Sequence, residues 1–182
     1  DGSISYETII ERYNSDLANT LGNLVNRTIA MSNKYFGGEI KAPTAPEALD
    51  DELKAFALET VAKVDKNIDS YHMADAVEAV INLAKRCNKY IDETAPWALA
   101  KDEANKERLG TVLYNLLEGI RFISVLLEAF MPETSKAILA QINCDIADYD
   151  SLSAFGALKA GGSVGTATPL FARIDAEKML AD

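Results

Sequence analysis

Residues 106–129 read KERLGTVLYNLLEGIRFISVLLEA and form the most apolar helical segment of the sequence. Its apolar residues recur at steps of three and four, which is the period of an α-helix, and they cover a wide face. The sequence therefore predicts a long helix that is the most buried element of the chain. Its longest apolar run, residues 122–127, is far shorter than the roughly 18 residues of a membrane span, so none is predicted.

Four further segments carry the same helical period. They cover residues 6–36, 51–68, 71–92 and 132–142. The paired glycines 37 and 38 end the first of these segments, and Pro96 ends the third, whose inward stripe includes Asn88. We therefore expect an all-α fold: an antiparallel bundle of four or five helices with a C-terminal extension.

The periodicity fades after residue 142, where glycines become frequent. We expect residues 1–142 to form the bundle and residues 143–182 to form a flexible linker and tail. Residues 168–174, TPLFARI, are apolar again, and this tail is expected to pack on the bundle or on a neighbouring domain. The chain lacks an initiator methionine and a signal-like start, so we expect it to be a piece of a longer protein.

Composition excludes several classes of chemistry. The chain has 182 residues and a net charge of −10, which argues against a non-specific nucleic-acid binder with a basic face. A single histidine cannot supply a di-iron site, and no catalytic residue is predicted, because the sequence has neither a phosphate-binding glycine loop nor a Ser/His/Asp set. No metal site is expected; binding of a metal by Cys87 and Cys144 is a weak alternative.

Two features of the pattern point to RNA. Asn23 and Arg27 lie one helical turn apart beside the apolar face of the first helix, and their amide and guanidinium groups can both reach the edge of a base. Trp97 follows a proline at a helix end, where an exposed indole is a stacking platform. On the pattern alone, a solvated helix flank and a core tryptophan remain open alternatives.

Several motifs resemble one known family. Residues 12–27, RYNSDLANTLGNLVNR, are similar to the opening helix of the anticodon-binding domain of methionyl-tRNA synthetases. Residues 88–97, NKYIDETAPW, match the methionyl branch more specifically, and the segment from Leu113 to Arg121 with the following Phe-Met-Pro also fits. Residues 169–174, PLFARI, resemble the segment by which the family's C-terminal part returns to its catalytic core.

The resemblance implies a site and a partner. In this family the residues that match Asn23, Arg27 and Trp97 bind the CAU anticodon of methionine-specific tRNA: the indole stacks on a base, and the other two read base edges. The candidates for phosphate contacts are Lys34, Lys85, Lys89 and Lys101, although each is equally well explained as a solvated charge.

The resemblance also implies a cytoplasmic parent enzyme, an ATP-dependent class I methionine–tRNA ligase. ATP, Mg²⁺ and in some cases Zn²⁺ would belong to its catalytic domain, whose His-Ile-Gly-His-like and Lys-Met-Ser-Lys-Ser-like motifs are absent here. We therefore expect this chain to hold no cofactor and to be inactive alone, with tRNA and that catalytic domain as partners. The alternatives are a helical scaffold domain without an RNA role, or the equivalent domain of a valyl, leucyl or isoleucyl enzyme.

The distribution of charge lowers the affinity for RNA that we expect of this chain. Residues 85–108 carry six basic and five acidic side chains, whereas residues 109–182 carry five and nine. Because counterion release supplies most nucleic-acid affinity, the chain alone is expected to bind RNA weakly.

Overall fold

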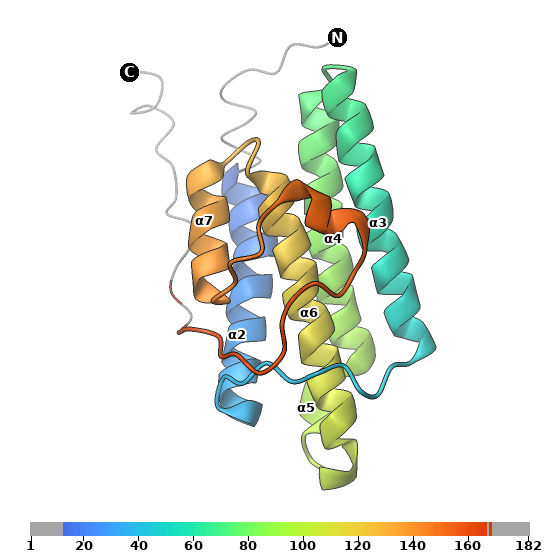
Figure 1. Cartoon of the computed structure of the whole chain (residues 1–182), viewed down its shortest axis with the longest axis vertical. Coiled ribbons are helices and arrows are strands. Elements are labelled where there is room, and N and C mark those ends of the chain that lie inside the picture. The colour runs from blue at the N-terminus through green and yellow to red at the C-terminus, as the bar shows by residue number, and fades with distance from the viewer. Residues whose placement is uncertain (1–12, 167, 169–182) are drawn as a thin grey trace.

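A computed structural model describes residues 13–166 and 168. Within that part the chain is helical and forms no β-strand, which confirms the predicted all-α class. The long helices stand side by side in Figure 1: α2 (Gly22–Phe36), α3 (Ala48–Asp69), α4 (Met73–Thr94), α6 (Lys106–Leu127) and α7 (Pro132–Gln141). The tail predicted at residues 169–174 and the first turns predicted at residues 6–12 lie outside the described residues.

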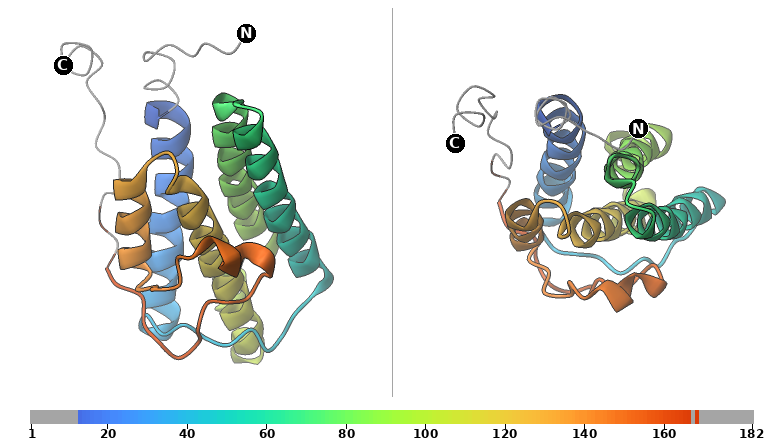
Figure 2. Two further views of the ribbon diagram at one scale, coloured as in Figure 1. Left: turned by 45° about the horizontal axis from the view of Figure 1, so that its top comes forward. Right: turned by 90° about the horizontal axis from the view of Figure 1, so that it is seen from above.

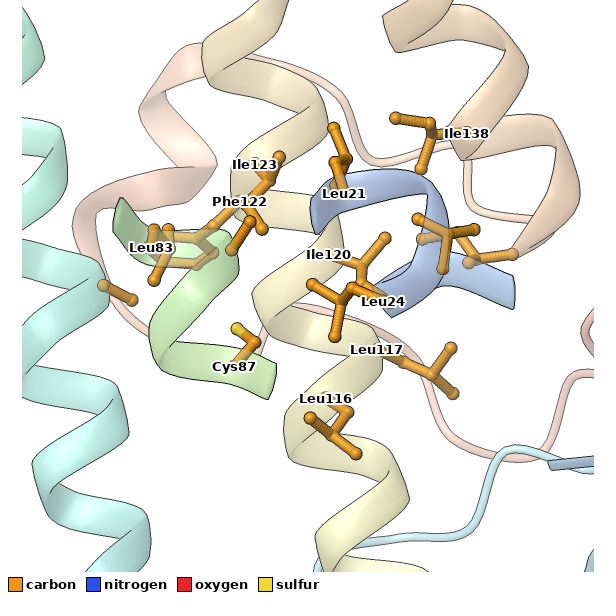
Figure 3. Close-up of a cluster of buried hydrophobic side chains, with 14 of the residues drawn as sticks. Leu21, Leu24, Leu83, Cys87, Leu116, Leu117, Ile120, Phe122, Ile123 and Ile138 are labelled. Carbon is orange, nitrogen blue, oxygen red and sulfur yellow. The ribbon is translucent and has the colours of Figure 1, made fainter. Parts of the chain in front are cut away.

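Helix α6 is the centre of the bundle, as its sequence predicts. From Arg108 to Leu127 every residue is buried, and the other long helices surround it. Figure 3 shows Leu83 of α4, Leu24 of α2 and Ile138 of α7 gathered around it. In length and composition the helix that ends at Leu127 could cross a membrane, but its apolar stretch is buried inside the described bundle, as in the core helix of such a fold.

The first helix differs from the expected single α-helix. Its described part begins as a π-helix, η1 (Tyr13–Leu21), and becomes α-helical at Gly22. Leu17 and Leu21 both face the core in spite of the change in period. The helix ends as predicted at Gly37, which adopts a left-handed conformation (φ 59°) and donates its N–H to Asn33 O at 3.1 Å.

Residues 143–166 are packed on the bundle, where the sequence analysis expects a flexible linker. One carboxylate oxygen of the buried Glu118 on α6, Oε2, accepts the backbone N–H groups of Gly156 and Ala157 at 2.6 and 2.8 Å. Tyr114, one turn earlier, donates its hydroxyl to Leu158 O at 2.6 Å. Polar groups on the buried helix α6 thus hold the backbone of this segment, which contains the short helix η3 (Tyr149–Ser153).

The same segment then meets the loop that follows α2. Ile40 donates its N–H to Gly162 O and accepts the N–H of Gly161, each at 2.8 Å, and Val164 N–H reaches Gly38 O at 2.8 Å. This short antiparallel pairing fixes the end of the described chain beside the lower end of α2 (Figure 1).

A buried polar cluster joins three helices. Asp50 at the start of α3 accepts two hydrogen bonds from the Arg108 guanidinium of α6, at 2.7 and 3.0 Å, and one from the Tyr90 hydroxyl of α4 at 2.6 Å. Burial by itself would raise the pKa of the Asp50 carboxyl, but the hydrogen bonds from Arg108 and Tyr90 outweigh it and hold that pKa below its ordinary value of 3.8.

This cluster makes stability depend on pH. The pKa of the Asp50 carboxyl is lower in the folded state than in the unfolded state. The ionised carboxyl therefore stabilises the fold fully above pH 3.8, and this contribution is lost as the pH falls from there through the pKa of the folded state. Asp50→Asn should lower the free energy of unfolding at pH 7 by about 1–3 kcal/mol, since buried donors lose their acceptor. Urea unfolding measured from pH 7 to pH 3 should show a smaller loss of unfolding free energy in the variant than in the wild type. If the unfolding free energies of the two proteins fell in parallel with pH, Asp50 would not be the group responsible.

Candidate nucleic-acid interface

Arg27 links α2 to α4. Its side chain is 41% exposed and points across to α4, where Nη1 donates to Asn88 Oδ1 at 3.5 Å and Nη2 lies 3.7 Å from Asp92 Oδ1. Asp92 lies in the last turn of α4, so Arg27 reaches the end of the helix that leads into α5 (Pro96–Leu99). The sequence analysis expects the arginine to point outward but gives no partner for it.

Asn23 and Lys34 lie on the same side of α2 as Arg27, at helical spacing from it. Both are exposed, whereas the inward side of α2 carries the buried Leu24 and Ile29. Lys34 lies in the last turn, with Nζ 5.6 Å from the Tyr35 ring centroid. The predicted stripe therefore faces solvent along the length of α2.

Trp97 is presented by a sharp break in the chain. Ala95 adopts a left-handed conformation (φ 47°), which ends α4, and the buried Pro96 begins α5. Pro96 suits the first turn of a helix because its missing N–H would have had no partner there. The next side chain, Trp97, is 46% exposed, so it is not a core tryptophan. It lies five residues beyond Asp92, the acidic partner of Arg27.

The remaining candidate lysines are also at the surface. Lys85 and Lys89 are exposed one turn apart on α4, flanking Asn88, and Lys101 is exposed just after α5. Arg86 differs from them: its side chain is 12% exposed, with Nη1 2.7 Å from Glu93 and Nη2 3.8 Å from Glu52. Lys85 and Lys89 therefore present their charge to solvent beside Asn88, the partner of Arg27, and Lys101 does so four residues after Trp97, whereas Arg86 is bound by acids.

The face between α2 and α4 is left open by the rest of the described chain. The view from above in Figure 2 shows residues 146–158 crossing the opposite side of the bundle, beyond α6. Two grooves, of 440 and 790 Å³, lie elsewhere, lined by residues of the segment after α7 and of the loop after α2. The interface is thus an open surface, suited to a macromolecule rather than to an enclosed small ligand.

Two residues of this interface, Asn88 and Asp92, are not predicted from the sequence. Asn88 stands in the predicted inward stripe of α4, and a carboxamide on such a stripe signals a buried polar contact. Neither cysteine belongs to this face. Cys87 is fully buried in the core, where burial raises the pKa of its thiol to about 12, and Cys144 is half-buried after α7.

Comparisons with known proteins agree with this description. The sequence model described as the anticodon binding domain of methionyl tRNA ligase matches residues 40–181. The methionine–tRNA ligases of Clostridium perfringens and Clostridium tetani are 52% and 50% identical to the chain over all 182 residues, which span 28% of each enzyme. The apo structure of Mycobacterium tuberculosis methionyl-tRNA synthetase superimposes with a TM-score of 0.84 at 31% identity, over 95% of this chain and 35% of that one.

The helical fold and these matches place the chain in the class of helical anticodon-binding domains of aminoacyl-tRNA synthetases. Within that class, the chain belongs to the family of anticodon-binding domains of methionyl-tRNA ligase. Neither a scaffold domain nor the valyl, leucyl or isoleucyl branch is favoured by these matches. The chain spans little more than a quarter of the curated relatives that it matches.

Proposed function

We propose that this chain recognises the CAU anticodon of methionine-specific tRNA through Asn23, Arg27 and Trp97. The observation that carries the proposal is that Arg27 reaches Asp92, in the last turn of α4, from which the chain passes directly to the exposed Trp97. An anticodon loop is single-stranded, so its bases can be unstacked, placed on an aromatic ring and read at their Watson–Crick edges. In this account Trp97 stacks on one base while Asn23 and Arg27 read edges.

The lysines around this face give the backbone contacts. Lys34, Lys85, Lys89 and Lys101 would each neutralise a phosphate, which fixes the position of the loop without reading its sequence. The chain as a whole is acidic, so most of the affinity for tRNA must come from the rest of the ligase.

The whole protein, in this proposal, is a cytoplasmic methionine–tRNA ligase that uses ATP to attach methionine to its tRNA. The M. tuberculosis relative has been solved with methionyl-adenylate, the product of ATP-dependent activation. ATP and Mg²⁺, with Zn²⁺ where a member uses it, would bind in the catalytic domain. The tail within residues 143–182 would dock on that domain.

Arg27→Lys tests the reading of a base edge. Lysine keeps the charge but loses the planar fork of donors, so we expect the preference for a CAU stem-loop over a scrambled loop to fall about tenfold. Binding titrations with both RNAs measure the ratio. Arg86→Lys is the matched control, because Arg86 is bound by Glu52 and Glu93, and its preference should be unchanged. An unaltered ratio in Arg27→Lys would argue against edge reading.

Lys85→Ala should behave differently. Loss of a phosphate contact weakens binding to CAU and scrambled loops alike, and it reduces the slope of log affinity against log salt by about 1. Titrations at several salt concentrations measure that slope. Lys66→Ala, on α3, removes the same charge away from the face and should leave the slope unchanged. A selective loss of CAU binding in Lys85→Ala would instead make Lys85 a base-reading residue.

A further inference from the structure

We propose that Asn88 is a positioning residue that sets the Arg27 guanidinium for reading a base edge; this inference rests on the proposed function. Asn88 is half-buried on α4, between the first helix and the exposed lysines. Its carboxamide makes two contacts with the first helix. Nδ2 donates to Thr20 O at 3.1 Å, and Oδ1 accepts from Arg27 Nη1 at 3.5 Å.

The Thr20 carbonyl fixes which way the carboxamide points. Thr20 lies where the π-helix η1 gives way to α2, at Leu21 and Gly22. In a π-helix each carbonyl accepts from the fifth residue on, and in an α-helix from the fourth, so two carbonyls compete for one N–H where the pattern changes. Asn88 Nδ2 donates to the Thr20 carbonyl from outside the helix, close to this change of pattern.

Because Nδ2 is committed to Thr20, Oδ1 must face Arg27. The carboxamide cannot flip without placing an oxygen against the Thr20 carbonyl and an NH₂ group against the guanidinium. Asn88 therefore orients the Arg27 guanidinium relative to the backbone at Thr20, just before Asn23. An aspartate in its place would keep an acceptor for Arg27 but lose the donor to Thr20.

The contacts orient Arg27 without locking it. The hydrogen bond to Asn88 is long and uses one of the five N–H groups of the guanidinium. The Asp92 carboxylate lies 3.7 Å from the other terminal nitrogen, and its side chain is 72% exposed, so water competes for this pair. A base edge can therefore take the remaining donors while Asn88 holds the group in place.

A double-mutant cycle separates positioning from a purely structural role. Asn88→Ala, Arg27→Ala and the double variant of the full chain are titrated at low salt with labelled CAU and scrambled stem-loops, and anisotropy gives the affinities. We expect Asn88→Ala to lower the preference for CAU by about threefold to tenfold. In the Arg27→Ala background the same change should have no further effect.

Two more variants complete the test. Asn82→Ala removes an exposed carboxamide from the same helix and should leave the preference unchanged. Asn88→Asp, nearly equal in shape, should lower the preference as Asn88→Ala does, which keeps the test decisive if the alanine variant does not fold. Two outcomes would overturn the proposal. In the first, Asn88→Ala lowers the preference for CAU equally with and without Arg27. In the second, Arg27→Ala lowers the preference but neither Asn88 variant does. No effect of Arg27→Ala itself would refute the proposed function of that arginine.

Discussion

Replacing Arg121 by alanine is expected to lower the free energy of unfolding by about 3–5 kcal/mol. The side chains of Arg121 and Glu118 form an ion pair on α6 in which neither partner is exposed. Arg121 also donates to Ile146 O at 3.1 Å and to Ser151 Oγ at 2.6 Å. Alanine would leave a buried carboxylate without its counter-charge and would free the segment that Arg121 holds.

Urea unfolding followed by circular dichroism measures this effect. Lys136→Ala is the matched control: Lys136 pairs with Glu133 at the same spacing along a helix, but their side chains are 73% and 91% exposed. Such a pair contributes roughly 0–1 kcal/mol. A loss in Arg121→Ala no larger than in Lys136→Ala would show that the buried pair does not hold the segment.

Replacing Trp97 by alanine is expected to weaken binding of the CAU anticodon by about 1–3 kcal/mol, the contribution of one stacked base. In the full-length ligase that contains this domain, charging of methionine-specific tRNA should slow, mainly through a higher KM for tRNA. Methionine activation by ATP should not change, because the proposed function assigns it to the catalytic domain.

Aminoacylation and ATP–pyrophosphate exchange assays separate the two steps. Tyr71→Ala is the control, since Tyr71 is another exposed aromatic side chain (86%) but lies in the turn between α3 and α4, at the other end of α4 from Trp97. It should leave both assays unaltered. Charging kinetics in Trp97→Ala equal to those of the wild type would remove the indole from the anticodon site.

The helices could be predicted from sequence because their signals are local. The expected segment 106–129 is observed as Lys106–Leu127, and 132–142 as Pro132–Gln141. Apolar period sets the buried side of each helix, while Gly37 and Pro96 set ends through backbone conformation. The exposure of Trp97 is different: the pattern leaves a core tryptophan open, and the structure shows the side chain 46% exposed. Its role toward RNA stays a prediction, as do those of Asn23 and Arg27.

The parts that sequence reasoning missed depend on long-range contacts. The packing of residues 143–166 is made by backbone groups that bond to Glu118 and Tyr114, so the segment's own side chains carry little signal of it. The contacts of Arg27 with Asn88 and Asp92 join residues more than 60 positions apart. Helical period places a side chain on a face but does not say which helix stands opposite.

Fluorescence emission reports on Trp97 alone, because Trp97 is the single tryptophan of the chain, and it therefore detects whether an anticodon base stacks on the indole. The chain is titrated with a CAU stem-loop and, separately, with a loop of the same composition in scrambled order. Stacking of an anticodon base on the indole predicts saturable quenching by the CAU loop and little change with the scrambled one. Emission that is unchanged by both loops, or quenched equally by both, would contradict anticodon recognition at this face.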